Sequence, residues 1–299
     1  MNRYYKYLDK LNSLEGKTFI VTGANSGLGL QTTIDLVYKK AHVIMACRNI
    51  SKAEKVKNEI RLKFNDANID IIQYDQSSFV SIDSFCDEIK NKYSQIDGLI
   101  CNAGVYFQKK NMKTKEGFDL TFGTNYLGVY YLINRLFDYL DKSFSKVLIV
   151  TSLTATFAKK NTKIKTLEKL NRNQLYGYSK YCLSRLCYEL DKKSKNIEFY
   201  LTHPGICQTN IISSETSGLP NWFSKIGHGF LYLFVHKSSK ACLTNLYALS
   251  LGNNKQKFIK PRGLFAISGY PKAYLYPQYC QKEIIEETKN YLKERGYKC

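Results

Sequence analysis

Tyr176 and Lys180 are four residues apart in the segment Tyr-Gly-Tyr-Ser-Lys. On a helix, this spacing places both side chains on one face. A phenol with a pKa of roughly 10 is a poor acid or base at neutral pH, but a neighbouring ammonium group favours the phenolate and lowers the phenol pKa. The pair could therefore exchange a proton with a substrate oxygen. Tyr178 offers no such pair, because Cys182 is the residue four positions after it.

Three glycines, Gly23, Gly27 and Gly29, lie in a turn that follows the β-rich run Lys17–Val21 and opens a helical pattern. In this context the first glycine permits a tight turn, the second lets the backbone approach a pyrophosphate, and the third allows close packing of helix on strand. The N-terminus of the following helix presents free N–H groups and the positive end of its dipole to the phosphates. The turn therefore predicts a dinucleotide site.

The end of the second apolar run bears on which dinucleotide binds. NAD-specific folds usually place an acid there for the ribose hydroxyls, whereas this chain has Arg48 and Asn49 after Cys47. A guanidinium can bind a 2′-phosphate through two charge-assisted hydrogen bonds, and Asn25 and Ser26 could add polar contacts. We therefore expect NADP(H) in preference to NAD. The alternative is that Arg48 is a solvated loop residue.

Short apolar runs alternate with helical patterns along the whole chain. This alternation predicts an α/β fold, a single Rossmann-type doubly wound parallel seven-stranded sheet with helices on both faces. Helices are expected at 30–38, 51–64, 80–93, 117–140 and 175–190. Strands are expected at Lys17–Val21, His42–Ala46, Ile69–Gln73, Asp97–Cys101, Lys146–Thr151, Glu198–Thr202 and Leu264–Ile267.

The glycine spacing Thr-Gly-x-x-x-Gly-x-Gly, with Tyr-x-x-x-Lys after the fifth expected strand, resembles the short-chain dehydrogenase/reductase family. The Ala-Cys-Arg-Asn segment, the long interval from Ser152 to Tyr176 and the His-Pro-Gly segment after the sixth strand resemble its retinol dehydrogenase-like NADP-dependent branch. The resemblance extends from about Gly16 to Ile267. It implies one domain over residues 1–299, with a cofactor-binding core at about 16–205 and a substrate lid at about 209–237.

The resemblance also implies roles for four catalytic residues. Ser152 would donate a hydrogen bond to a substrate carbonyl, and Tyr176 would deliver the proton. Lys180 would tune Tyr176 and bind the nicotinamide ribose, while Asn125 would complete a proton relay through water. Thr151 is the local alternative to Ser152, and Asn125 could instead be an ordinary polar helix residue.

The implied cofactor contacts extend over most of the expected strand ends. Asp75 would lie near the adenine amine, unless it caps a helix. Cys101 replaces the more usual asparagine before Asn-Ala-Gly, and His203 is expected to be structural. The expected contacts are Gly23, Asn25, Ser26, Gly27, Leu28, Gly29, Arg48, Asn49, Asp75, Gln76, Asn102, Ala103, Gly104, Tyr176, Lys180, Pro204, Gly205, Ile206 and Thr209.

The lid is rich in apolar residues, including Trp222, Phe223 and Phe230. Such a lid suits a small lipophilic carbonyl or alcohol of the retinoid, steroid or fatty aldehyde class. The same residues also suit shallow membrane contact or simple packing on the core. The lysine-rich insertion at Asn161–Gln174 is expected to be a surface loop.

The chain of 299 residues carries a net charge of +20. Such an excess raises nucleic acid, a membrane surface or an anionic ligand as partners, but the basic residues recur along the whole chain, so most are interpreted as solvated surface. The nine cysteines form no CxxC pair and suggest no metal site, only buried, reduced thiols. With no apolar leader and no run of about 18 apolar residues, we expect a cytoplasmic protein, or a peripheral one on the cytosolic face of a membrane.

Alternatives remain at this point. The fold could serve a catalytically silent NADPH-binding or regulatory protein, or an epimerase or ring reductase. The complete set of Asn125, Ser152, Tyr176 and Lys180 favours the oxidoreductase over the silent protein. Family members often pair through the helices that bear Asn125 and Tyr176, so a homodimer is also open, whereas no specific nucleic-acid partner is expected.

Overall fold

The structure is a computed structural model, and it describes residues 3–106, 108, 111–205, 238–252, 254–263, 266–267 and 269–297. Ile206, Thr209 and the expected lid at 209–237, with Trp222, Phe223 and Phe230, lie outside the described residues. Among the described residues, no helix is both long and apolar enough to cross a membrane.

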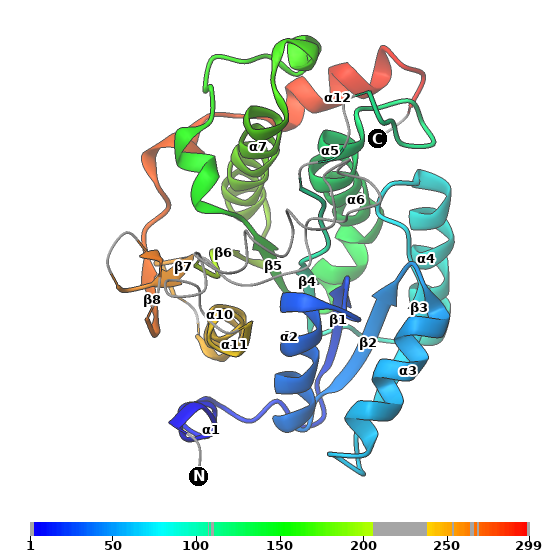
Figure 1. The fold of residues 1–299 in the computed structure, drawn as a ribbon, viewed down its shortest axis with the longest axis vertical. Helices are drawn as coiled ribbons and strands as arrows, with labels where there is room; N and C mark the ends of the chain where they lie inside the picture. Colours follow the sequence, from blue (N-terminus) through cyan, green and yellow to red (C-terminus); the bar gives the residue numbers. More distant parts are fainter. Residues whose placement is uncertain are drawn as a thin grey trace, which may run out of the picture.

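The centre of the fold is an eight-stranded sheet in the order β3-β2-β1-β4-β5-β6-β7-β8 (Figure 1). The first seven strands pair in parallel, and β8 pairs antiparallel with β7. The strands are β1 (Thr18–Thr22), β2 (His42–Cys47), β3 (Ile69–Gln73), β4 (Gly98–Cys101), β5 (Lys146–Val150), β6 (Glu198–Thr202), β7 (Phe258–Pro261) and β8 (Pro271–Tyr274).

The expected α/β fold with a mainly parallel sheet is confirmed. Of the expected seventh strand at Leu264–Ile267, Leu264 and Phe265 lie outside the described residues, and the prediction is wrong for Ala266 and Ile267, which are not in a strand. Ala266 has a φ of 56°, outside the β region, and lies in the connection between β7 and β8. The seventh strand is instead β7, which Pro261 ends, and β8 makes an eighth.

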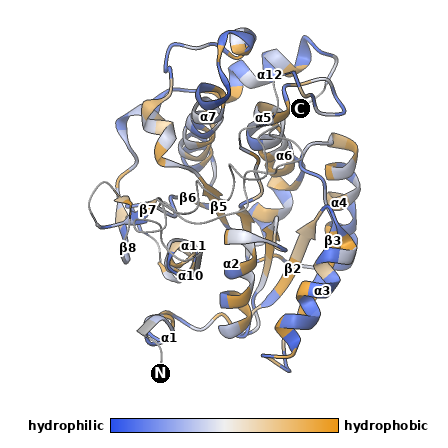
Figure 2. Cartoon of the chain, viewed as in Figure 1, coloured by the Kyte–Doolittle hydropathy of each residue, from blue (hydrophilic) through white to orange (hydrophobic). Residues whose placement is uncertain are grey.

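Helices cover both faces of the sheet and bury a separate apolar cluster on each. Strand β2 is mainly hydrophobic, whereas α3 mixes hydrophobic and hydrophilic residues (Figure 2). One face carries α1 (Arg3–Leu8), α2 (Gly27–Tyr38), α3 (Ile50–Arg61), α10 (Ser238–Ala241) and α11 (Leu243–Ser250). The other carries α4 (Phe79–Lys92), α5 (Leu120–Phe122), α6 (Gly128–Lys142), α7 (Arg172–Lys193) and α12 (Ile285–Lys293).

The helix expected at 117–140 begins later and is interrupted. Asp119 caps α5 by accepting a hydrogen bond from the Phe122 N–H. A π-helical turn at Gly123–Leu127 then joins α5 to α6. Such turns are rare and often occur at functional sites, and this one contains Asn125.

The insertion between β5 and α7 is more ordered than a surface loop. It contains a short 3-10 helix, Ile164–Lys169, in which Ile164 and Leu167 are buried. The Ile164 N–H donates to Glu287 Oε1 of α12 at 2.8 Å. The expected loop is therefore wrong for this segment, because its apolar side chains pack beneath α12 while its lysines stay exposed.

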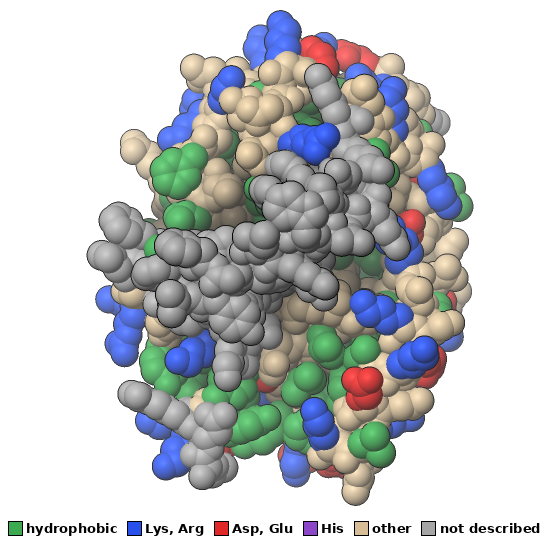
Figure 3. Space-filling model, in the orientation of Figure 1, with side chains coloured by type: hydrophobic (Ala, Val, Ile, Leu, Met, Phe, Trp, Pro, Cys, Tyr) green, Lys and Arg blue, Asp and Glu red, His purple; other side chains and the backbone are tan. Residues whose placement is uncertain are grey.

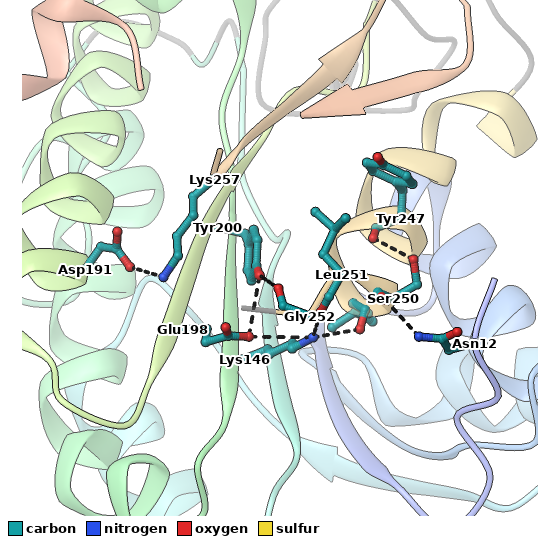
Figure 4. A network of polar contacts seen from close by, with 11 residues as sticks. Asn12, Lys146, Asp191, Glu198, Tyr200, Tyr247, Ser250, Leu251, Gly252 and Lys257 are labelled. Atoms are coloured by element: carbon teal, nitrogen blue, oxygen red, sulfur yellow. Dashed lines mark hydrogen bonds and ion pairs between the residues drawn. The ribbon is translucent and has the colours of Figure 1, made fainter. Parts of the chain in front are cut away.

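A polar network closes the amino ends of β5 and β6 (Figure 4). Lys146 donates to the carbonyl oxygen of Leu251 and lies 3.6 Å from Glu198 Oε2. Lys257 pairs with Asp191 at 2.7 Å. These contacts tie the end of α11 to β5 and the segment before β7 to α7, at the end of the strands opposite to the glycine turn.

The described surface does not gather its basic residues into one patch on the face that Figure 3 shows. Lys and Arg side chains surround that face, with a few acidic residues among them (Figure 3). All seven described cysteines are buried, free thiols. The distribution supports the interpretation of most of the +20 charge as solvated surface.

Candidate active site

A cavity of about 530 Å³ opens at the carboxyl ends of the central strands. This is where the strand order reverses, between β1 and β4, the usual ligand position in doubly wound sheets. The cavity brings together most of the residues expected from the sequence. Its walls include Gly23, Asn25, Ser26, Gly27, Leu28, Arg48, Asp75, Gln76, Asn102, Ala103, Gly104, Ser152, Tyr176, Lys180, Pro204 and Gly205.

The glycine turn at one end of the cavity depends on the absence of side chains. Gly23 has a φ of 67° and Gly27 a φ of 53°, both in the left-handed region. A Cβ on Gly29 would lie 2.3 Å from the carbonyl oxygen of Gly23. Because glycine carries no side chain, the first turn of α2 can pack directly against the backbone of Gly23, which places the N-terminus of the helix beside the cavity.

Thr22, which the sequence analysis did not assign to the site, ties the turn to the next strand. Its Oγ1 accepts hydrogen bonds from the N–H groups of Asn102 and Ala103, both at 2.9 Å. The Asn102 side chain donates to the carbonyl oxygen of Thr22 at 2.9 Å. Thr22 directly precedes Gly23 in the glycine-rich segment, and this position is the sequence feature that could have indicated the role.

Arg48 and Asn49 have different environments after β2. Arg48 is exposed on the cavity wall and, within the described part of the chain, forms no ion pair. Asn49 does not line the cavity, and its Oδ1 accepts a hydrogen bond from the Lys52 N–H at 2.8 Å. The Asn49 side chain therefore caps α3, and only Arg48 is placed to meet an anionic ligand.

Asp75 and Gln76 both line the cavity, after β3. Asp75 Oδ1 accepts hydrogen bonds from Ser77, from the N–H at 2.9 Å and from the hydroxyl at 2.6 Å. Gln76 Nε2 donates to the carbonyl oxygens of Ala103 at 2.9 Å and Thr124 at 2.7 Å. Gln76 thus holds the loop after β4 against the π-helical turn.

Tyr176 and Lys180 project from α7 into the other end of the cavity. The Lys180 Nζ lies 5.9 Å from the centroid of the Tyr176 ring and donates to the carbonyl oxygen of Val150 at 2.9 Å. Only 4% of Lys180 is exposed, and this burial lowers its pKa to about 8. The helix therefore holds a buried amine, which still ionises near neutral pH, beside the tyrosine.

The hydroxyls of Thr151 and Ser152 separate into two roles. Thr151 Oγ1 donates to the carbonyl oxygen of Lys180 at 3.2 Å and lies 2.9 Å from Ser184 Oγ. Ser152 is only partly buried, and its Oγ accepts one long hydrogen bond, 3.3 Å, from the Thr154 N–H. Ser152 is thus the residue of the two whose hydroxyl retains hydrogen-bonding capacity toward the cavity.

Asn125 is fully buried and does not line the cavity. Its Oδ1 accepts from the Val105 N–H at 2.7 Å, and its Nδ2 donates to the Val105 carbonyl at 2.9 Å and to Ser179 Oγ at 3.2 Å. The side-chain amide is therefore committed to joining the loop after β4 to α7.

Two further cavity residues are Tyr106 and His203. Tyr106 follows Asn-Ala-Gly-Val directly, a position that could have identified it, and its ring contacts that of Tyr176. His203 is buried, and burial, together with the charge of Lys260, lowers its pKa to about 4. His203 is therefore neutral at physiological pH.

Two other observations concern the rest of the described chain. Within the described ranges, no cluster of three or more His, Cys, Asp or Glu side chains could hold a metal ion. A larger cavity of about 910 Å³ lies between the insertion and α12, and none of the expected site residues lines it. Of the four expected catalytic residues, Ser152, Tyr176 and Lys180 therefore share the cavity at the strand ends, and Asn125 lies behind its wall.

Residues 17–219 match the family model for short chain dehydrogenase. The chain belongs to this family. It is 34% identical over 218 residues to mouse retinol dehydrogenase 14, covering 66% of this chain and 63% of that protein. It is 31% identical over 250 residues to a Drosophila melanogaster WW domain-containing oxidoreductase, covering 78% of this chain and 58% of that protein. The matched region is thus less than two thirds of either relative.

The fold is also similar to solved structures. A crystal structure of an uncharacterized protein from Mycobacterium paratuberculosis superposes with a TM-score of 0.70 at 24% identity, over 92% of this chain and 91% of that one. Membership of this family implies a nicotinamide dinucleotide cofactor. The residues present fit such a group, since Gly23 and Gly27 of the turn line the same cavity as Tyr176 and Lys180.

Proposed function

We propose that this protein is an NADP(H)-dependent oxidoreductase that interconverts a carbonyl and an alcohol on a small lipophilic substrate. The observation that carries the proposal is that Tyr176 and the buried Lys180 share one cavity with the glycine turn. A dinucleotide held by the turn would extend toward an acid–base pair at the other end. Family membership and the names of the relatives, a retinol dehydrogenase and an oxidoreductase, support the reaction class.

Arg48 supports NADP(H) over NAD. Its guanidinium has no carboxylate partner in the described chain, and no acidic side chain follows β2 to bind the ribose hydroxyls. A 2′-phosphate at this position would gain a charge-assisted, bidentate contact. When bound, the dinucleotide supplies or accepts the hydride.

The protein's own residues handle the substrate oxygen. Ser152 and Tyr176 donate hydrogen bonds to a carbonyl oxygen and so polarise it. As negative charge develops on that oxygen, the Tyr176 hydroxyl transfers its proton. The Lys180 ammonium, 5.9 Å from the ring, stabilises the resulting phenolate. In the oxidation direction the phenolate accepts the alcohol proton.

The lipophilic substrate class has two supports. The relatives include proteins named retinol dehydrogenase, and the expected lid is rich in apolar residues such as Trp222, Phe223 and Phe230. We propose a retinoid, a steroid or a fatty aldehyde as the substrate. The same apolar segment would allow peripheral contact with the cytosolic face of a membrane.

A screen of NADPH oxidation tests this proposal. Retinal, steroid ketones, fatty aldehydes and quinones are offered to the full-length protein, with NADH in parallel. We expect turnover with at least one lipophilic carbonyl and faster turnover with NADPH than with NADH. Tight NADPH binding without reduction of any carbonyl would contradict the proposal and support the catalytically silent alternative.

A further inference from the structure

Tyr106 lies between the loop after β4 and the first turn of α7, the helix that carries Tyr176. The residue before it, Val105, is held at both its N–H and its carbonyl by the Asn125 side chain, at 2.7 and 2.9 Å. Asn125 is itself fully buried in the π-helical turn. The backbone that leads into Tyr106 is therefore fixed, and this limits where the Tyr106 ring can lie.

The Tyr106 ring contacts the ring of Tyr176. The two centroids are 4.6 Å apart and the planes are inclined at 62°, an edge-to-face arrangement. Aromatic pairs in this geometry attract each other beyond the area that they bury. The contact restricts the positions that the partly exposed Tyr176 side chain can take.

The Tyr106 hydroxyl makes a second connection to α7. It donates to Asn173 Oδ1 at 2.8 Å, and Asn173 lies one turn before Tyr176 on the same helix. Burial raises the pKa of Tyr106, so its hydroxyl remains protonated and able to donate. The first turn of α7 is further ordered by the capping box between Asn171 and Gln174.

We propose that Tyr106 is a positioning residue for Tyr176: its ring and its bond to Asn173 hold the phenol of Tyr176 in one orientation toward the substrate oxygen. The proposal rests on the function proposed above. Misplacing a reacting group by a small distance lowers the rate strongly. The hydrogen bond and the ring contact described for Tyr106 go to Asn173 and Tyr176 of α7, whereas the phosphates would be held by the glycine turn and Arg48. Loss of Tyr106 should therefore lower kcat and leave NADPH affinity unchanged.

Two substitutions separate the ring from the hydroxyl. Tyr106→Leu removes both contacts and is expected to lower kcat about three- to tenfold, the range that corresponds to an aromatic pair. Tyr106→Phe keeps the ring and should lower kcat by less. Asn173→Ala should have the same effect as Tyr106→Phe, because each substitution removes the same hydrogen bond. The double variant should therefore have no lower kcat than either single variant.

Tyr139→Leu is the matched control. Tyr139 is also partly buried and donates to a backbone carbonyl, that of Tyr93, at 2.8 Å, but it lies on α6 away from the cavity. We expect it to leave kcat unchanged. An unchanged kcat in Tyr106→Leu, or an equal loss of kcat in Tyr139→Leu, would overturn the proposal.

A spectroscopic measurement keeps the test independent of turnover. In protein labelled with 13C at the tyrosine Cζ, the Tyr176 resonance is assigned by its absence in Tyr176→Phe. We expect one sharp Tyr176 resonance in the wild type and in Tyr139→Leu, and a shifted or broadened one in Tyr106→Leu. An unchanged resonance in Tyr106→Leu would overturn the positioning role, while a changed resonance in a protein without turnover would refute only the proposed function.

Discussion

Lys146, which is partly buried, and Lys180, which is buried, lie at opposite ends of the sheet and differ in the partners that surround them. Lys146, at the amino end of β5, donates to the carbonyl oxygens of Leu249 and Leu251 and lies 3.6 Å from Glu198 (Figure 4). Lys180, near the carboxyl end, donates to the carbonyl of Val150, and among the described residues no carboxylate lies within ion-pair distance of it. Burial lowers the pKa of both lysines, and Glu198 opposes the effect at Lys146.

This difference indicates which of the two lysines is available for chemistry. An ammonium group has three N–H donors, and at Lys146 three oxygens surround it. At Lys180 the described contacts engage one donor, and the residue borders the cavity. Lys146 therefore stabilises the fold, while Lys180 retains donors that a ribose or a water could accept.

Replacing Lys180 with methionine should give the largest effect of this comparison. Without the ammonium, Tyr176 loses the charge that favours its phenolate, and we expect kcat to fall about 10²–10⁴-fold, the usual range for general acid–base catalysis. Steady-state kinetics with the best carbonyl substrate measures this. Lys146→Met is the control, and a similar loss of kcat in both variants would remove the distinction between the two lysines.

Replacing Arg48 with glutamine tests the other end of the same cavity. A hydrogen bond to a charged group contributes about 1.5–3 kcal/mol, so NADPH should bind roughly 10- to 150-fold more weakly while NADH affinity stays nearly constant. Fluorescence titration with both dinucleotides measures this. Arg61→Gln, at the end of α3 and outside the cavity, is the control; an equal loss for both dinucleotides would contradict a 2′-phosphate contact.

Lys146→Met should act on stability instead of turnover. The substitution leaves Glu198 and the carbonyls of Leu249 and Leu251 without their donor. An unsatisfied buried polar group costs about 1–3 kcal/mol, and because this network is only partly buried, we expect the lower end of that range, about 1 kcal/mol. We expect the free energy of unfolding in urea to fall by about this amount while kcat remains unchanged. A variant as stable as the wild type would show that the network in Figure 4 is not stabilising.

The smallest expected effect is the change of kcat/KM with pH near neutrality. Because the pKa of Lys180 is lowered to about 8, its ammonium form predominates below that pH and is lost above it. We expect kcat/KM to be level up to about pH 7, to have fallen by about half at pH 8, and to keep falling above it. The residual activity of Lys180→Arg, whose guanidinium stays protonated, should lack this decline, and an identical decline in both proteins would assign it to another group.

The sequence predicted the parts of the fold that local pattern determines. Several of the first six strands are continuous apolar runs, as expected of parallel strands buried on both faces, and the predicted positions of all six agree with the structure within one residue at each end. The turn containing Gly29 was predictable because its spacing follows from steric needs. All of the expected cofactor residues that the structure describes, apart from Gly29 and Asn49, line one cavity.

Other features depend on contacts between distant residues and could not be predicted in this way. The insertion was predicted to be a loop because lysines dominate its composition. The Ile164 N–H nevertheless donates a hydrogen bond to Glu287, which is far along the chain. β7 and β8 mix lysines and prolines with apolar residues, so neither is a continuous apolar run. The pairing of Tyr106 with Asn173 likewise required the packed structure.

The central claim is that Tyr176 is the proton donor, and the most direct test compares Tyr176→Phe with Tyr178→Phe on the same helix. Tyr178 is buried, and its hydroxyl donates to the carbonyl of Thr162 at 2.7 Å, away from the cavity. In carbonyl-dependent NADPH oxidation, we predict that the turnover of Tyr176→Phe falls about 10²–10⁴-fold while its NADPH affinity is unchanged. Tyr178→Phe should keep the turnover of the wild type. Wild-type turnover in Tyr176→Phe would contradict the account.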